Sequence, residues 1–373
     1  MRRILAISLF IVLSGCFIYQ KITIKGKGNV KLEQVDFAML EGWEEDDQKK
    51  ALGAFIQSCN KFSKMAQNRV IGGQIGDITV GDFRDVCEIA QIVKTMSAKQ
   101  ARNFFENWFK VFLVSDKSGN SKGLFTGYYE ADLRGSRVKT AKYKYPIYAR
   151  PKDLNSEPYL TRQEIDCGDA LKNRGLELLY VDDAAELFFM HIQGSGRVTL
   201  PDGTVVRVTF AGRNNQPFVG ITNYMLEKKY VERSETNAES IKQWLQKNPD
   251  KAQEVMDVNP AYTFFKISDG EYVVGAQGAP LTAERSMAID NDIFSYGFPL
   301  WLDTTLRKKG NAKETYQHLF VAQDTGTAIK GVVRGDIFFG HGDEAEERAS
   351  YTAAQGQYYI LLPINVVDKM RKR

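Results

Sequence analysis

The chain has 373 residues, more than most single hydrophobic cores contain, so we expect one or two domains with a large buried core. Hydrophobic residues make up 43% of the chain and charged residues 26%, a composition that excludes a disordered or fibrous protein. Fifty Lys and Arg against 46 Asp and Glu give a net charge of +4 without a block of like charges, so no nucleic-acid-binding tail is indicated.

The N-terminus has the pattern of a secretory signal. Two arginines precede an apolar run at 4–13, which is far shorter than the roughly 20 residues that a transmembrane helix needs. The run ends in Leu-Ser-Gly-Cys at 13–16, which resembles the bacterial lipobox. That resemblance implies removal of residues 1–15 and acylation of Cys16, which would anchor the chain stably to a membrane. The alternative is a plain signal peptide. Phe17, where inner-membrane lipoproteins carry Asp, favours the outer membrane.

Three further cysteines allow at most one intramolecular disulfide in an oxidising compartment. We expect a bond between Cys59 and Cys87, because both lie on neighbouring predicted helices, whereas Cys167 lies in a different segment. The cysteine spacings do not match a zinc site, and the three histidines lack metal-ligand spacing. We therefore expect no metal and no cofactor.

The N-terminal part has helical periodicity. Apolar residues recur at intervals of three and four over 46–66 and again over 82–95, as in helices buried on one face. Ser97 and Gln100 form a capping box that opens a third helix with an aromatic face. We therefore expect the first hundred mature residues to be mainly helical.

After residue 111 the sequence changes to short apolar runs separated by turn residues, a pattern typical of strands. The clearest hairpin covers 198–210, with Pro-Asp-Gly at its turn. Helices at 161–171 and 236–256 each begin with a Thr-x-x-Glu capping box, and 262–363 returns to strand patterning without a long helix. This order predicts a mainly β, α+β protein with a helical N-terminal layer.

Three aspartates in the last hundred residues follow apolar runs in turn-like settings: Asp290, Asp324 and Asp336. Each alone fits a turn-capping residue better than a catalyst. Together with two Gly-rich loops, they fit carboxylates presented at the mouth of a barrel.

The surrounding motifs fall in a fixed order along the chain. They are Thr-Gly-Tyr-Tyr-Glu at 126–130, Tyr-Pro-Ile-Tyr at 145–148, His-Ile-Gln-Gly-Ser-Gly at 191–196, Phe-Ala-Gly at 210–212, Asn-Pro-Ala-Tyr-Thr-Phe-Phe at 259–265, Gly-Ala-Pro-Leu-Thr at 278–282, Ala-Gln-Asp-Thr-Gly at 322–326 and Gly-Asp at 335–336. From about residue 124 to residue 362 this order resembles the membrane-bound lytic murein transglycosylase A family, with its C-terminal three-aspartate domain.

The resemblance implies a double-psi β-barrel with an inserted second β-domain, the two enclosing a groove for a glycan strand. We expect the following boundaries: a lipoprotein signal peptide at 1–15, a mainly helical part that packs with the barrel at 16–125, an inserted β-domain that forms one wall of the groove at 126–257, and the barrel with the three-aspartate region at 258–373.

The resemblance also implies the reaction, which breaks the β-1,4 bond between N-acetylmuramic acid and N-acetylglucosamine and leaves a 1,6-anhydromuramoyl end. The essential aspartate falls on Asp336 and its partner on Asp324. One acid–base carboxylate suffices, because the C6 hydroxyl of the substrate is the nucleophile and is held intramolecularly. An apolar setting and the like charge of Asp324 would raise the pKa of Asp336, as an acid requires.

The expected partners are peptidoglycan glycan strands, the membrane through the lipid anchor, and other cell-wall enzymes. The residues that we expect to bind substrate are Thr126, Tyr128, Tyr129, Glu130, Gln193, Gly194, Ser195, Gly196 and Asp290. For the tyrosines and glycines, barrel core and plain turns are equally good interpretations, and Glu130 fits either a groove carboxylate or a surface charge.

Two other functions fit parts of the sequence. Asp-Thr-Gly at 324–326 also resembles the aspartic-protease triplet, but such a protease needs two triplets and the chain has one, so it would have to form a homodimer. A non-catalytic lipoprotein that tethers peptidoglycan would use the same groove without needing carboxylates at its bottom.

Overall fold

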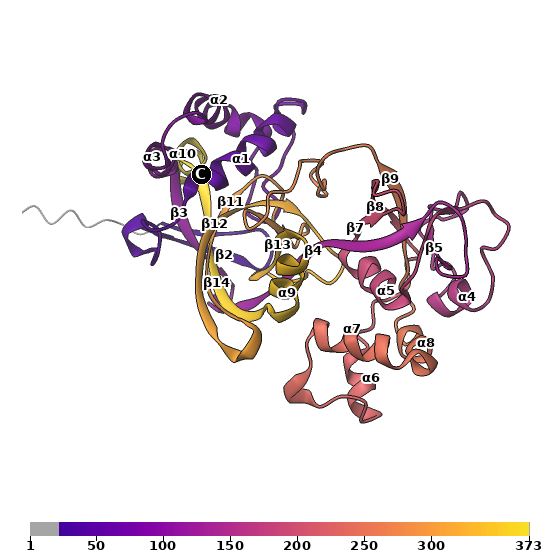
Figure 1. Cartoon of the computed structure of the whole chain (residues 1–373). Coiled ribbons are helices and arrows are strands. Elements are labelled where there is room, and N and C mark those ends of the chain that lie inside the picture. The colour runs from indigo at the N-terminus through magenta and orange to yellow at the C-terminus, as the bar shows by residue number, and fades with distance from the viewer. Residues whose placement is uncertain (1–21, 373) are drawn as a thin grey trace, which may run out of the picture.

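The computed structural model describes residues 22–372, without the side chain of Glu235, so Cys16 and the signal at 1–15 lie outside the described residues. The fold is a mixed α/β arrangement built on one large sheet, with helices at two ends (Figure 1). Within 22–372, no helix is both long enough and apolar enough to cross a bilayer.

Fourteen strands make up the sheet of the described chain. They are β1 (Thr23–Lys25), β2 (Val30–Val35), β3 (Phe109–Asp116), β4 (Gly123–Ser136), β5 (Tyr145–Tyr148), β6 (Glu177–Val181), β7 (Ser195–Thr199), β8 (Val205–Arg213), β9 (Thr263–Ser268), β10 (Ser286–Ile289), β11 (Pro299–Arg307), β12 (Lys313–Asp324), β13 (Arg334–His341) and β14 (Ala353–Pro363).

The α-helices are α1 (Gln48–Phe62), α2 (Arg84–Val93), α3 (Ala98–Trp108), α4 (Arg162–Asp166), α5 (Ala184–Gln193), α6 (Thr222–Glu227), α7 (Ala238–Lys247), α8 (Pro249–Asp257), α9 (Asp343–Tyr351) and α10 (Ile364–Arg371). Short 3₁₀ turns lie at η1 (Phe37–Met39), η2 (Val80–Phe83), η3 (Arg233–Glu235) and η4 (Lys309–Asn311).

Six strands of the sheet close on themselves. They follow the order β14, β11, β12, β10, β13, β4, and β14 also pairs with β4, which completes the ring. The β10–β12 and β13–β4 pairings are parallel, and the other four are antiparallel. Strand β4 continues beyond the ring and pairs with β7, so one long strand joins the ring to the β7–β8–β9 part of the sheet.

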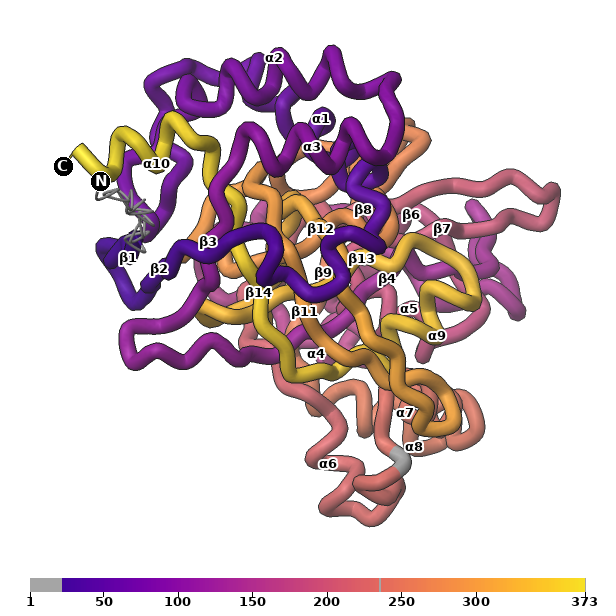
Figure 2. Tube along the Cα trace, turned by 90° about the vertical axis from the view of Figure 1, so that its left-hand side faces the viewer, coloured from indigo at the N-terminus to yellow at the C-terminus, as the bar shows by residue number. Residues whose placement is uncertain are grey.

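Helices α1, α2, α3 and the C-terminal α10 gather over one side of the ring, as Figures 1 and 2 show from two directions. Phe55 of α1 packs against three aromatic rings of the α3 region, Phe104, Phe105 and Phe109, so the predicted aromatic face is core. A disulfide joins Cys59 on α1 to Cys87 on α2, with an S–S distance of 2.06 Å, as the sequence suggested.

The N-terminal part is less uniformly helical than expected, because β1 and β2 extend the sheet next to β3. The hairpin at 198–210 is present as β7 and β8, joined at 200–204. Helix α5 was not expected, because apolar residues occur on all of its sides and leave no amphipathic pattern. Asp183 caps its N-terminus, and Gly194 ends it in a left-handed conformation (φ 85°).

Two predicted helices differ from the structure. The helix expected at 236–256 is split into α7 and α8, because Pro249 has no amide hydrogen for a helix interior and instead opens α8. Asn237 with Ser240, rather than Thr236 with Glu239, forms the capping box of α7. The helix expected at 161–171 ends at Asp166; its Thr161 capping box is present.

Candidate active site

Asp324 and Asp336 come together through strand β10. Ala288 pairs with Asp324 on β12 at one side and with Asp336 on β13 at the other. Adjacent strands lie about 4.8 Å apart, so the two backbones are roughly 10 Å apart. The β10–β12 register shifts between Met287 and Ala288, so the common face is indicated by contacts: Tyr128 donates to Asp324, and the charges of both aspartates raise the pKa of this tyrosine. The expected pair of carboxylates therefore shares one face of the ring.

Asp336 lies inside β13, as its third residue, rather than in a turn after a strand as expected. The preceding Gly335 allows the neighbouring strands to pack closely, since a Cβ there would lie 2.6 Å from Sδ of Met287 and 2.9 Å from the ring of Phe125. Asp336 is thus fixed by the sheet itself, with Thr126 of β4 as its direct partner in register.

The surroundings of the Asp336 carboxyl raise its pKa toward neutral pH. Thr126 Oγ1 donates a 2.6 Å hydrogen bond to Oδ1 of Asp336. Burial raises the pKa of Asp336 to about 6, and the Asp324 charge adds to this, whereas the Thr126 hydrogen bond and the Arg334 charge oppose it. Arg334 in turn donates to Thr126 Oγ1 at 2.8 Å. Arg334 was missed from the sequence, because its link to Asp336 runs through a residue of another strand.

Asp324 at the end of β12 has more donors. Its Oδ1 accepts from the backbone N–H groups of Ala276 (2.9 Å) and Thr325 (2.9 Å), and Oδ2 accepts from the hydroxyl of Tyr128 (2.8 Å). Burial raises the pKa of Asp324, and these three hydrogen bonds oppose the rise. The Tyr128 pKa is raised well above its usual value by burial and by Asp324, so the phenol remains a donor.

Asp290, the third aspartate, connects two loops. It is buried, and its carboxylate accepts from the backbone N–H of Gly331 (2.8 Å) and from Nζ of Lys330 (3.1 Å). These contacts join the end of β10 to the loop before β13. Asp290 thus supports the backbone around the site, and its expected role in substrate binding stays a prediction.

The two residues after Tyr128 are both buried, so Glu130 differs from both of its interpretations, whereas Tyr129 fits the core interpretation. Glu130 is 1% exposed and forms an ion pair with Arg207 of β8 at 2.6 Å, so it is neither an open groove carboxylate nor a surface charge. Tyr129 is buried in the core, where its backbone N–H donates to Oε1 of Gln193 at 3.1 Å. Both residues fasten β4 to the inserted part.

The segment 193–196 is a junction rather than a loop. Gln193 ends α5, Gly194 is its C-cap, and Ser195 and Gly196 begin β7. A Cβ at Gly196 would lie 2.4 Å from Sδ of Met190, so this glycine is required for packing. Ser195 is buried. Two of the four contact β4, the strand that carries Thr126 and Tyr128: Gln193 through the backbone N–H of Tyr129, and Gly196 through its pairing with Ala131.

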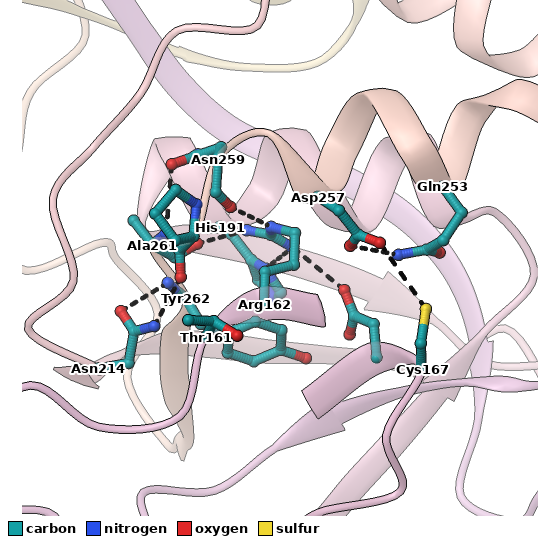
Figure 3. Close-up of polar contacts among 12 residues, drawn as sticks. Thr161, Arg162, Cys167, His191, Asn214, Gln253, Asp257, Asn259, Ala261 and Tyr262 are labelled. Carbon is teal, nitrogen blue, oxygen red and sulfur yellow. Dashed lines mark hydrogen bonds and ion pairs between the residues drawn. The ribbon is translucent and has the colours of Figure 1, made fainter. Parts of the chain in front are cut away.

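His191, which opens the same motif, belongs to a separate buried cluster (Figure 3). Arg162 Nη1 donates to its Nδ1 at 3.1 Å, and burial together with this guanidinium lowers the His191 pKa well below its usual value. Arg162 also donates to the backbone oxygens of Asn259 (3.2 Å) and Ala261 (2.8 Å). This cluster joins α4, α5 and the segment before β9, so the histidine of the 191–196 motif stabilises the fold of the insert.

The arrangement suits proton transfer at one carboxyl. The pKa of Asp336 is raised to about 6, and it lies beside a second carboxylate that accepts three hydrogen bonds, which favour the charged form of Asp324. In the part of the chain that the structure describes, no group of three or more His, Cys, Asp and Glu could hold a metal ion.

Comparison with known proteins gives the family. Two family models match, the MltA specific insert domain at 124–266 and the 3D domain at 285–362. Membrane-bound lytic murein transglycosylase A of Vibrio cholerae is 34% identical over 250 residues, 66% of this chain and 66% of that protein. The Escherichia coli K12 protein of the same name is 30% identical over 251 residues, 66% of this chain and 67% of that one.

Solved structures extend the likeness to most of the chain. The membrane-bound lytic murein transglycosylase from Agrobacterium tumefaciens has a TM-score of 0.80 at 29% identity and covers 91% of this chain and 99% of its own. MltA from Neisseria gonorrhoeae has a TM-score of 0.75 at 32% identity, and the match covers 92% of this chain and 94% of that one. The chain therefore belongs to the membrane-bound lytic murein transglycosylase A family of peptidoglycan-cleaving enzymes.

Proposed function

We propose that Asp336 is the single acid–base catalyst of this lytic transglycosylase and that Asp324 is its supporting carboxylate. The observation that carries the proposal is the pKa of Asp336, about 6, in a half-buried carboxyl that is hydrogen-bonded by Thr126 and faces a second aspartate. A group with this pKa is protonated often enough near neutral pH to give a proton, and it is basic enough to take one back.

The reaction then has two proton transfers at one oxygen position. Asp336 gives its proton to the glycosidic oxygen as the bond from C1 of N-acetylmuramic acid breaks and the N-acetylglucosamine hydroxyl leaves. The Asp336 carboxylate next removes the proton from the C6 hydroxyl of the same sugar, whose oxygen bonds to C1 and forms the 1,6-anhydro ring. No water enters the product, because the nucleophile is already part of the substrate.

The two aspartates divide the work by their surroundings. Asp324 remains the better hydrogen-bonded anion, and its negative charge raises the pKa of Asp336 and favours the positive charge that develops at C1. Arg334 and Thr126 hold the Asp336 carboxyl in place for both transfers.

We further propose that the six-strand ring is a double-psi barrel and that the inserted part, with β7, β8 and β9, forms one wall of a glycan groove, with the ring as the other. The expected boundaries at 126 and 258 differ from the strand pairing, because β4 belongs to the ring as far as Glu130 and β9 pairs with β8. The closed strand order and the two parallel pairings support the barrel type. A solved structure of E. coli MltA contains bound chitohexaose, and its likeness to this chain, with a TM-score of 0.68, is consistent with a sugar-polymer groove here.

The location that fits this function is the periplasmic face of the outer membrane, with Cys16 lipidated after removal of residues 1–15. The Leu-Ser-Gly-Cys run at 13–16 supports the anchor, and relatives named as membrane-bound support membrane association. Attachment there would put the enzyme next to its polymeric substrate and to other cell-wall enzymes.

Mass spectrometry of the products from purified peptidoglycan tests the proposal. The expected products are soluble muropeptides with 1,6-anhydromuramoyl ends. Reducing muramic acid ends would contradict the mechanism, since they require attack by water. A peptidoglycan tether would release nothing, and an aspartic protease would digest casein but leave the glycan strands intact.

A further inference from the structure

The residue before Asp324 connects the helical layer to the site. Gln323 points to the opposite face of β12 and is fully buried under α1. Its Nε2 donates to the backbone oxygen of Ala54 (2.9 Å) and to Oγ of Ser58 (3.0 Å), and its Oε1 accepts from Oγ of Ser286 (2.6 Å). One buried amide thus joins α1, β12 and β10.

The same hydrogen bonds reach the turn that binds Asp324. Ser58 Oγ donates to Oε1 of Gln277 at 2.7 Å, and the backbone N–H of Gln277 donates to the backbone oxygen of Gln323 at 3.1 Å. The residue before Gln277 is Ala276, whose N–H donates to Oδ1 of Asp324 at 2.9 Å. The donor that orients Asp324 is therefore held, through its neighbour, by Ser58 and Gln323.

The turn has little freedom to compensate for a lost contact. A Cβ at Gly275 would lie 2.5 Å from the backbone oxygen of Gln323, so the turn packs directly on β12. On the other side of the network, Ser58 directly precedes Cys59, whose disulfide to Cys87 fixes α1 against α2. The hydroxyl of Ser58 is thus presented from a cross-linked helix.

We infer that Ser58 and Gln323 are positioning residues for catalysis: through the 275–277 turn they hold the carboxylate of Asp324 beside Asp336. The inference rests on the proposed roles of these two aspartates. It gives α1 and its disulfide a function in the reaction, in addition to covering one side of the ring.

Loss of this network should change turnover more than substrate affinity. Both side chains lie on the helix side of β12, away from the face that carries the two aspartates. Displacement of a reacting group by about 1 Å can reduce a rate by up to about 100-fold. We therefore expect kcat to fall roughly 10- to 100-fold, with little change in KM.

Three variants of the full chain in detergent test this: Gln323→Met, which keeps the side-chain volume without the amide, Ser58→Ala, and the double variant. The matched control is Gln48→Met, because Gln48 is also a buried amide on α1 (1% exposed) but donates to the backbone oxygen of Trp43, away from the aspartates. Release of anhydromuropeptides from purified glycan strands gives kcat and KM, and thermal unfolding gives the stability of each variant.

Both single variants should have a lower kcat at nearly constant KM, and Gln48→Met should have the kcat of the wild type. The double variant should have about the same kcat as Gln323→Met, because both changes break one network. The positioning role would be overturned if Gln323→Met and Ser58→Ala had the same kcat as Gln48→Met. It would also be overturned if the loss of kcat in the double variant were the product of the losses in the two single variants. Failure of the wild-type enzyme to release anhydromuropeptides would instead overturn the proposed function.

Discussion

Asp324 and Asp336 are in register with the same residue, Ala288, from opposite sides of strand β10. Their surroundings are unequal, because Asp324 accepts from two backbone N–H groups and a tyrosine hydroxyl, whereas Asp336 accepts from the hydroxyl of Thr126. The sheet thereby places two carboxyls close together in unequal surroundings, which is the basis of the different roles proposed for them.

Asp324→Asn should impair the enzyme less than loss of Asp336 and should shift its pH dependence. The Asp324 charge raises the pKa of Asp336, so its removal lowers that pKa. Arg334, Thr126 and Tyr128, which also face the pair, remain in place. Since Asp336 must be protonated to act as the acid, the alkaline limb of the kcat/KM profile should move to lower pH. An unchanged or upward-shifted limb would contradict the coupling.

Thr126→Val should shift the same limb in the opposite direction. The Thr126 hydroxyl favours the charged form of Asp336, so its loss raises the Asp336 pKa further, and the acid remains protonated to higher pH. Activity at the optimum should fall, because Arg334 and Asp336 both lose a partner. Measurement of kcat/KM against pH for both variants, at constant ionic strength, checks the opposed signs.

Asp336→Asn should stabilise the folded protein while it lowers activity by roughly 10² to 10⁴. The folded-state pKa of Asp336 is raised from 3.8 to about 6, so the wild-type fold loses stability as pH rises through this range. The amide of the variant does not titrate, so its free energy of unfolding at pH 7 should exceed that of the wild type by up to about 3 kcal/mol. This difference should disappear below about pH 4. Urea unfolding at pH 4 and pH 7 measures it. Equal stability differences at the two pH values would contradict the assigned pKa.

Much of the fold follows from local sequence signals. The periodicity at 46–66 and 82–95 and the Ser97 capping box predict α1 to α3, and the neighbouring helices predict the Cys59–Cys87 bond. Helix α5 has apolar residues on every side, so its period is hidden, and the break between α7 and α8 depends on Pro249 overriding a continuous helical pattern.

The site is predictable in its residues but not in its contacts. The motifs pick out Asp324, Asp336 and Thr126, and their order supplies the family. Partners from distant strands, such as Arg334 with Thr126 and Arg207 with Glu130, depend on register between strands that are far apart in the sequence. No local pattern carries that information, which is why Glu130 was expected in the groove.

Cys16→Ala should release the enzyme from the membrane without changing its chemistry. The prediction follows from the Leu-Ser-Gly-Cys run at 13–16, since the acyl chains are the proposed anchor. Metabolic palmitate labelling should disappear, and the protein should move to the soluble fraction. A matched control is Cys167→Ser, which removes the exposed free thiol and should leave labelling intact. Continued labelling of the Cys16 variant would contradict the anchor.

The central claim is that Asp336 carries the proton in both steps, and product analysis of Asp336→Asn tests it most directly. The amide keeps the size of the side chain and can still accept from Thr126, but it cannot exchange the proton, so release of 1,6-anhydromuropeptides should fall by roughly 10² to 10⁴. Binding to insoluble peptidoglycan should persist. Near wild-type release of anhydromuropeptides by this variant would show that another group is the catalyst.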